Sequence, residues 1–313
     1  MSDELEFEAE DAPRSALFGW PLLVTLLSCL VLILAAAFAP TLLPRLDLRT
    51  MVLAGAGAGF ALWLLVLLAG SRTRQWLVVG VALLVLPAPG ALAGLGAGRI
   101  HVARASMDAQ TFAEVDVAAD GKPSVPGAAA DRGVASAAYL AAIREMDKDG
   151  RAYGDAMGKF NLGVLSSPYL LQQAPQILAD CASISSLEQV AQDHSKRARA
   201  RAAQLVAAVD RSDLPPETKP GARKVVTAGD ADAMLAVRIE VIRASRAQCE
   251  LLAPRSWHNA AGYFGVASGG DRARFAATTE RLLEAAGEIE ALQRAAKDQR
   301  ISGRAEVREA LMR

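Results

Sequence analysis

The chain has 313 residues, of which 52% are apolar, and its 34 basic residues balance its 34 acidic residues. This length accommodates a membrane module and one further domain. Because the net charge is zero and the sequence carries no nucleic-acid-binding motif, we expect no nucleic-acid partner.

An acidic tail at residues 1–15 precedes a long uncharged segment at about residues 16–39. The tail begins MSDELEFEAED, whereas a cleaved signal peptide begins with basic residues and ends at a small-residue cleavage site. The uncharged segment is also longer than the apolar core of a signal peptide. We therefore expect it to be retained as a membrane helix.

Two more uncharged segments follow at about residues 51–70 and 76–98. Each segment has roughly the 20 residues that cross a hydrocarbon core of about 30 Å, and a helix pairs all of its own backbone groups in lipid. The sequence thus predicts three transmembrane helices, with residues 16–98 as a membrane domain in the lipid bilayer. The segments contain no Asp, Glu, Lys or Arg, which disfavours an ion-coupled transporter.

Glycines recur at four-residue spacing within the second and third segments. They are Gly55 and Gly59 in the second, and Gly90, Gly94 and Gly98 in the third. This spacing places glycines on one stripe of a helix, where a neighbouring backbone can approach closely. The neighbour is either another helix of the same chain or a second copy, so the pattern also allows a homo-oligomer through these faces.

Two long helices are predicted in the middle of the polar part of the chain. The sequence SSLE at residues 185–188 reads as a capping box, and the helix that it starts ends at about Arg211. The turn SDLPPET leads to a second helix, which ends at about Leu252. Pro220 and Gly229 are potential breaks of this second helix.

The hairpin formed by these helices predicts a disulfide between Cys181 and Cys249. Each cysteine lies 34 positions from Pro215, so an antiparallel hairpin centred there can bring their Cα atoms to the about 4.4–6.8 Å that a disulfide needs. The alternatives are two reduced core cysteines or a metal site, although no Cys-x-x-Cys spacing supports a metal. Cys29 lies in the first apolar segment, and we expect it to be an inert apolar residue.

A disulfide persists in an oxidising compartment. We therefore expect a multi-pass protein of a bacterial inner membrane, with its C-terminal domain in the periplasm. Basic residues near the segment ends give little guidance, because this orientation places three of them in the cytoplasm and the opposite orientation places four there. The reverse orientation stays an alternative.

The composition divides the rest of the chain into three parts. An Ala-, Gly- and Pro-rich stretch at residues 99–134 predicts a linker, and a charged tail is expected at residues 300–313. Apolar residues at helical spacing between them predict a soluble bundle domain at residues 135–299. The expected fold is all-α, with an antiparallel bundle of about four main helices and no sheet.

The sequence contains no complete catalytic, cofactor-binding or metal-binding motif. EMDKDGRAYGDAM resembles a calcium loop, but the twelfth position, which needs Glu, is Ala156. We expect that segment and the basic stretch DHSKRARAR to be solvated helix surfaces, with His194 as an interior imidazole. We expect no enzyme activity and no cofactor.

Aromatic residues cluster in one glycine-rich connection. This connection, APRSWHNAAGYFGVASGG, contains Trp257, His258, Tyr263 and Phe264. The rings either fold over the open end of the bundle or form a rim that binds a partner, since aromatic side chains often dominate protein interfaces. Without catalytic motifs, the bundle is expected to bind another protein of unknown identity, in an envelope-assembly, sensor-like or immunity-type role. The alternatives are a subunit of an oligomeric channel or transport complex, or a cytoplasmic helical adaptor if the orientation is reversed.

Overall fold

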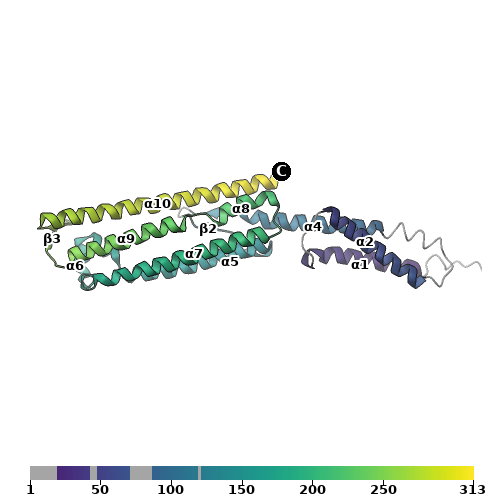
Figure 1. Ribbon diagram of the computed structural model, residues 1–313, viewed down its shortest axis with the longest axis horizontal. Helices are drawn as coiled ribbons and strands as arrows, with labels where there is room; N and C mark the ends of the chain where they lie inside the picture. Colours follow the sequence, from purple (N-terminus) through teal and green to yellow (C-terminus); the bar gives the residue numbers. More distant parts are fainter. Residues whose placement is uncertain (1–19, 43–47, 71–86, 119–120) are drawn as a thin grey trace, which may run out of the picture. The chain divides into compact units, whose positions relative to one another are not determined.

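The computed structural model describes residues 20–42, 48–70, 87–118 and 121–313. The chain divides into two compact units, Met1–Arg104 and Ala105–Arg313. Helices make up most of the described residues, and the only described strands belong to two short hairpins. The structure therefore confirms a mostly helical fold (Figure 1).

The first unit contains α1 (Trp20–Leu42), α2 (Leu48–Gly70) and the beginning of α4 (Pro87–Ala113). The acidic tail and the first half of the third predicted span lie outside the described residues. No helix within the described residues combines the length and the hydropathy that a membrane span requires. The structure therefore does not support the three predicted transmembrane helices.

Helices α2 and α4 touch through their backbones at glycines. A Cβ atom on Gly55 would overlap the carbonyl oxygen of Gly90, and a Cβ atom on Gly90 would overlap that of Gly55. A Cβ atom on Gly94 would likewise overlap the carbonyl oxygen of Met51. Gly59 belongs to the same contact, since its Cα lies 3.2 Å from the Cβ position of Gly90. These glycines therefore serve a contact within one chain.

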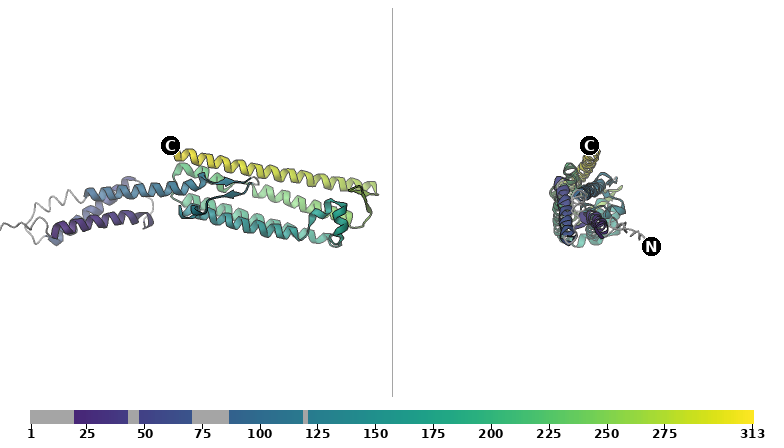
Figure 2. Two further views of the ribbon diagram at one scale, coloured as in Figure 1. Left: turned by 180° about the vertical axis from the view of Figure 1, so that it is seen from behind. Right: turned by 90° about the vertical axis from the view of Figure 1, so that its right-hand side faces the viewer.

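The second unit is built from four long helices and one short one. They are α5 (Val134–Gly158), α7 (Ser186–Arg211), α8 (Lys219–Val226), α9 (Ala231–Leu252) and α10 (Gly269–Met312). Helix α5 packs on α7, α7 packs on α9, and α10 lies along both α8 and α9. Figures 1 and 2 show the result, an elongated bundle with α10 along one side and α5 along the opposite side.

Short elements connect these helices. The strands are β1 (Asp116–Val117) with β2 (Pro123–Ser124), and β3 (Trp257–Ala260) with β4 (Tyr263–Val266), each pair antiparallel. The remaining helix is α6 (Pro168–Gln173). The 3-10 turns are η1 (Gly127–Asp131), η2 (Leu162–Ser166), η3 (Pro175–Ala179), η4 (Cys181–Ser185) and η5 (Pro216–Thr218). The aromatic connection, expected without strands, therefore contains the β3–β4 hairpin.

Residues 99–134, expected as a linker, are mostly ordered in the structure. Helix α4 continues to Ala113, and the buried carboxylate of Asp108 accepts hydrogen bonds from the backbone amides of Ala135 and Ser136, at 3.1 and 2.7 Å. Asp108 thereby satisfies amides of the first turn of α5. This contact joins residues distant in sequence, which composition alone does not reveal.

Residues 300–313, expected as a tail, continue α10 almost to the C-terminus. Arg304 and Arg308 extend from α10 and donate hydrogen bonds to the carbonyl oxygens of Val115 and Ala113, at 3.0 and 2.7 Å. Because Ala113 ends α4, Arg308 satisfies a carbonyl group that the helix leaves without an internal partner. The charged end of the chain is therefore part of the bundle.

The predicted capping box does not form, although the predicted bounds of its helix are correct. Helix α7 begins at Ser186 and ends at Arg211, but the Ser185 hydroxyl donates backwards to the carbonyl oxygen of Ala182 at 2.7 Å. Glu188 instead accepts two hydrogen bonds from Arg243 of α9, both at 3.1 Å. The reason is that η4 runs directly into α7, so Ser185 already has helical backbone angles.

The second predicted helix of the hairpin is broken into α8 and α9. The break lies at Gly229, whose φ of +108° favours glycine, and the Asp230 carboxylate then caps α9 by accepting from two backbone amides. Pro220 causes no break because it occupies the first turn of α8, where a missing amide hydrogen costs little.

Two hydrophobic clusters form the interior of the second unit. The Tyr139 cluster contains Ala109, Phe112, Ala113, Val115, Ala135, Tyr139, Ala142, Ile143, Leu205, Val209, Leu214, Ala222, Val225, Val226 and Val307. The Ile242 cluster contains Val164, Leu165, Leu171, Leu178, Cys181, Ile184, Leu187, Ala191, Ile242, Cys249 and Leu252. Helices α5 and α7 contribute to both, because Tyr153 and Met157 of α5 pack against the Ile242 cluster.

Candidate functional site

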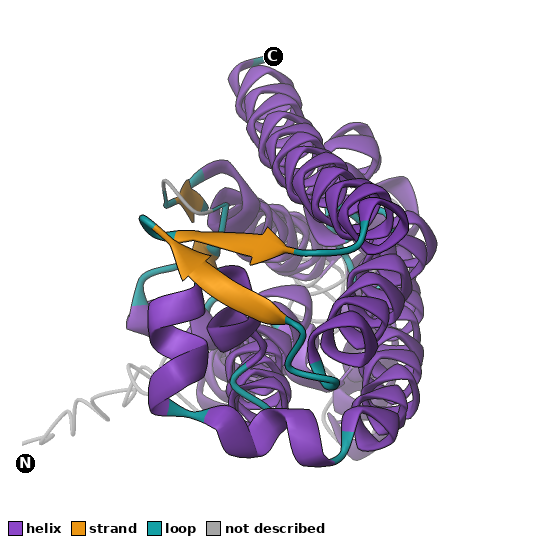
Figure 3. Ribbon diagram, turned by 90° about the vertical axis from the view of Figure 1, so that its left-hand side faces the viewer, coloured by secondary structure: helices purple, strands orange, loops and turns teal. Residues whose placement is uncertain are grey.

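The β3–β4 hairpin closes one end of the bundle (Figure 3). Its two strands pair in the register Trp257 to Val266, and the turn residues Ala261 and Gly262 both have positive φ, at 53° and 97°. Such a turn matches the right-handed twist of paired strands. The Asn259 side chain accepts a hydrogen bond from the Gly262 amide at 2.8 Å, which holds the turn. The aromatic residues are thus carried by a defined scaffold.

Two of the four predicted surface residues point into the bundle. The rings of Trp257 and Phe264 meet edge to face at 5.0 Å between centroids, and Phe264 lies 5.2 Å from Phe275 of α10. The indole nitrogen of Trp257 donates to the carbonyl oxygen of Leu252 at 3.1 Å, which satisfies its only polar atom. Both rings pack against the Ile242 cluster and anchor the hairpin.

The other two predicted residues lie on the outside. Tyr263 is 79% exposed, and His258 is also exposed. The His258 ring lies directly over Gly265, where any Cβ atom would overlap it. The cluster expected from sequence therefore divides into an anchoring pair and a surface pair.

Helix α6 adds two exposed side chains that the sequence reading did not single out. Tyr169 is 56% exposed and Leu170 is 46% exposed. Helix α6 contacts β3, and a Cβ atom on Gly262 would lie 3.5 Å from the Tyr169 ring. We call this surface, formed by Tyr169, Leu170, His258 and Tyr263, the tyrosine surface.

Both segments that build the tyrosine surface lack charged residues. Residues 160–179 and 256–270 contain no Asp, Glu, Lys or Arg, although 22% of the chain is charged. The exposed positions carry uncharged polar, aromatic and apolar side chains instead. The lack of charged residues was the sequence signal that could have identified α6 as part of this surface. The signal becomes informative once the two segments are known to meet.

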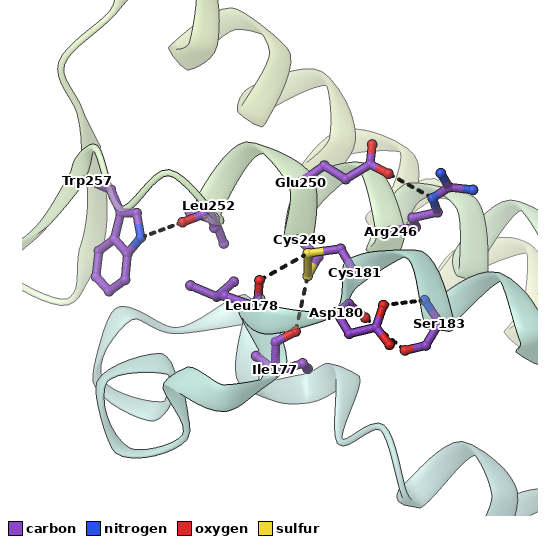
Figure 4. Close-up of a disulfide and its surroundings, with 10 residues drawn as sticks. All are labelled: Ile177, Leu178, Asp180, Cys181, Ser183, Arg246, Cys249, Glu250, Leu252 and Trp257. Carbon is purple, nitrogen blue, oxygen red and sulfur yellow. Dashed lines mark hydrogen bonds and ion pairs between the residues drawn. A yellow bond between two sulfur atoms is a disulfide. The ribbon is translucent and has the colours of Figure 1, made fainter.

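A disulfide joins η4 to α9 beside this end of the bundle (Figure 4). The Cα atoms of Cys181 and Cys249 are 5.6 Å apart, which confirms the predicted pair. Both residues are buried in the Ile242 cluster, and their sulfur atoms contact the carbonyl oxygens of Leu178 and Ile177. Cys29 in α1 is a free, half-buried cysteine. The bond indicates an oxidising compartment.

A shallow cavity of about 260 Å³ opens near the disulfide. Its lining includes Lys159 and Phe160 at the end of α5, together with Ile177, Asp180 and Ile184. The Asp180 carboxylate already accepts from the Ser183 amide at 3.1 Å, as Figure 4 shows. Among the described residues, no group of three or more His, Cys, Asp and Glu side chains could hold a metal ion.

A cluster of charged and aromatic side chains lies in the middle of the bundle. We call it the polar layer, and its members are Asp149 and Tyr153 of α5, His194, Arg197 and Arg201 of α7, and Arg238 of α9. Its centre is the Asp149 carboxylate, whose side chain is 8% exposed. Arg197 Nε lies 2.6 Å from Oδ1, and Arg201 donates to Oδ2 at 2.8 Å. The segment expected as a solvated surface therefore holds a buried ion pair.

Aromatic stacking completes the polar layer. The His194 ring stacks on Tyr153 with centroids 4.7 Å apart, and the Arg238 guanidinium lies 4.6 Å from the centroid of the same tyrosine ring. His194 Nδ1 lies 3.1 Å from Asp149 Oδ2, but it makes no hydrogen bond of good geometry. His194 is thus an interior imidazole, surrounded by cations.

The pKa values of the polar layer follow from burial and charge. Burial favours protonation of Asp149, but hydrogen bonds from Arg201 and Arg197 outweigh it and hold the pKa of this carboxyl below its ordinary value. Burial lowers the pKa of His194, the positive charge of Arg238 lowers it further, and Asp149 compensates only in part. Asp149 is therefore ionised and His194 neutral near pH 7.

Comparison of the chain with protein-family models, curated proteins and solved structures found no match. Two features of the described residues bear on function, an uncharged exposed surface at one end of the bundle and the polar layer in the middle.

Proposed function

We propose that this protein is anchored in a bacterial inner membrane by residues 16–98 and binds another protein through the tyrosine surface of an extracytoplasmic bundle. The observation that carries the proposal is the tyrosine surface itself. It combines exposed aromatic and aliphatic side chains with two segments free of charged residues, on a scaffold fixed by a disulfide.

Exposed apolar side chains on the first unit support the membrane anchor. Large aliphatic and aromatic residues on α1, α2 and the start of α4 are between 40% and 71% exposed. They include Leu26, Leu27, Leu30, Ile33, Phe38, Leu53, Phe60, Leu65 and Leu92. A water-soluble protein rarely exposes a contiguous apolar surface of this kind, whereas lipid tails cover it at no cost.

The disulfide supports the extracytoplasmic orientation. Cytoplasmic thiols are kept reduced, and structural disulfides persist outside that compartment. Cys249 is fully buried and Cys181 nearly so. Burial protects the bond after it has formed, but formation requires an oxidising environment.

The composition of the tyrosine surface favours a polypeptide as its partner. Tyrosine contributes a large contact area together with a hydroxyl that can form a hydrogen bond, and charged side chains are depleted in the cores of protein interfaces. A nucleic acid or an anionic lipid headgroup would instead require clustered basic residues. The surface contains no Lys or Arg.

Site-specific photo-crosslinking in cells tests this function. A photoreactive amino acid replaces Tyr169 or Tyr263, and the control position is Leu283, which is 70% exposed on α10. We expect the same heterologous polypeptide to be captured from both tyrosine positions and not from Leu283. Leu170→Asp should abolish capture, because it places a charge in an interface that has none.

Two outcomes would contradict the proposal. One is capture of only further copies of this chain from both tyrosine positions. The other is equal labelling of many proteins from Tyr263 and Leu283, which would mean that the tyrosine surface has no preferred partner.

A further inference from the structure

The polar layer separates the two hydrophobic clusters along the bundle. On α5, Ile143 belongs to the Tyr139 cluster and Met157 packs against the Ile242 cluster, with Asp149 between them. On α7 the order is reversed, from Ala191 of the Ile242 cluster through the polar layer to Leu205 of the Tyr139 cluster. The interior is therefore two apolar cores joined by a layer of charged side chains.

Two features that weaken helices also lie near this level. The break between α8 and α9 lies beside the polar layer, because the Ser195 hydroxyl donates to the Ala231 carbonyl at 3.1 Å and Arg199 pairs with Asp232 at 2.7 Å. In α5, Gly150 next to Asp149 is exposed and has no neighbour within 4 Å of its Cβ position. A helical glycine without a packing role costs about 1 kcal/mol relative to alanine.

The charges in the layer do not balance when His194 is neutral. Three guanidinium groups, those of Arg197, Arg201 and Arg238, face one carboxylate. That carboxylate is already occupied, since Arg197 binds one oxygen and Arg201 the other. The Asp149 and Arg201 side chains are only 8% and 15% exposed, so little water screens the interaction between them, whereas the Arg197 side chain is 50% exposed.

A proton on His194 would therefore meet three cations and a single carboxylate that is already paired with two arginines. From α5, it faces Asp149, whose Oδ2 it would share with Arg201, and Tyr153, whose ring is also bound by Arg238. From α7 and α9, it faces only further cations, namely Arg197, Arg201 and Arg238.

We propose that the polar layer is a pH-responsive joint, in which protonation of His194 loosens the contact between α5, α7 and α9 and uncouples the two hydrophobic clusters. Acidification of the surrounding compartment then loosens the attachment of the bundle end that carries the β3–β4 hairpin, while both hydrophobic clusters stay packed. Protonation of a buried histidine is a known means by which proteins sense pH.

The direction of the response follows from the pKa of His194. Burial and neighbouring cations place this pKa below the ordinary value of about 6.5 that the unfolded chain retains. The unfolded or locally opened chain therefore binds the proton first, so stability is full above pH about 6.5 and falls as the pH drops below it. Asp149 adds a further loss only at much lower pH, because its pKa is lowered from an already low value.

Hydrogen–deuterium exchange of the full chain in lipid nanodiscs tests the joint. Exchange is compared at pH about 7.5 and about 5.5, after correction for the intrinsic pH dependence of the exchange rate. We expect peptides from residues 146–156, 192–203 and 227–240 to lose more protection on acidification than peptides from the two clusters, because the locally opened chain takes up the proton more readily than the folded chain. A uniform loss, or none, would overturn the proposal.

Variants of the histidine separate its titration from its packing. His194→Phe keeps a ring to stack on Tyr153 and His194→Gln keeps a polar group, but neither can be protonated. Both should abolish the selective acid response, whereas His258→Gln, a change of an exposed histidine, should preserve it. An acid response that survives in both His194 variants would overturn the proposal.

A measurement on the unaltered protein guards against variants that fail to fold. The chain has three histidines, so ¹³C-labelled histidine gives a spectrum that His194→Gln can assign. The His194 signal should titrate below the ordinary value of about 6.5. Titration at or above that value would contradict the joint even if the exchange data supported it.

Discussion

Asp149 shows how one carboxylate can organise a helix bundle. It sits in a run of charged residues on α5, yet its side chain is 8% exposed and binds two arginines of α7. Removing one partner of a buried ion pair leaves the other charges desolvated and unpaired, which is more costly than the pair itself is stabilising. The layer therefore fixes the register of α5 against α7.

Asp149→Ala should lower the free energy of unfolding by about 3–5 kcal/mol, because it leaves the buried Arg201 guanidinium without its carboxylate. Asp147→Ala is the matched control, since Asp147 lies two positions away on the exposed face and should change stability by less than about 0.5 kcal/mol. Denaturant titration of the full chain in detergent, followed by circular dichroism, measures both. Equal effects would mean that the Asp149 pair contributes nothing particular.

At the scale of whole elements, glycines set which helices can touch. Gly55, Gly90 and Gly94 let α2 and α4 meet at their backbones, and Gly221 and Gly303 do the same for α8 and α10. A side chain at either contact would overlap a carbonyl oxygen of the facing helix. These glycines of the first unit therefore form a contact within the chain.

Gly94→Leu should separate α2 from α4, because its side chain would overlap the Met51 carbonyl. Gly96→Leu, two residues along the same helix, should be tolerated, since nothing lies within 4 Å of its Cβ position. An engineered cysteine pair at Val52 and Leu95 could report α2–α4 proximity by oxidative crosslinking in membranes. We expect crosslinking to fall at least about tenfold in the Gly94 variant only, as for a contact worth more than 1.4 kcal/mol. Loss in both variants would argue against the glycine contact.

For the whole molecule, the proposed orientation connects the two units to two environments. The first unit exposes apolar side chains suited to lipid, and the second holds a disulfide that needs an oxidising compartment. The proposed topology of three spans with an extracytoplasmic C-terminus predicts that the sequence between the second and third segments faces the cytoplasm.

Alkaline phosphatase fused after Arg313 should be active, because this reporter requires an oxidising compartment to form its own disulfides. Fusion after Arg74, between the second and third segments, should be inactive. Thiol labelling in intact cells should find Cys181 and Cys249 unreactive until a reductant is added. Activity of the Arg74 fusion alone would reverse the orientation and leave a cytoplasmic adaptor.

Periodicity in the sequence located the long helices but not all of their ends, since α4 and α10 extend into the predicted linker and tail. The disulfide followed from symmetry about Pro215, whereas the correct start of α7 was predicted from a capping box that does not form. The symmetry about Pro215 predicted the correct cysteine pair despite the break between α8 and α9, because both helices run in the same general direction. The β3–β4 hairpin was not predicted because its strands are only four residues long. Aromatic side chains also lie on both of its faces, which hides the alternation of apolar and polar residues that is typical of a strand.

What the sequence determined by itself is local: which segments are helical, which are free of charge, and which cysteines can pair. The tertiary structure decided which charged residues are buried, which glycines touch another helix, and which aromatic rings face outward. The physical reason is that burial and pairing depend on residues far apart in the chain. Arg197, Arg201 and Arg238 form a polar layer with Asp149 only when three helices come together.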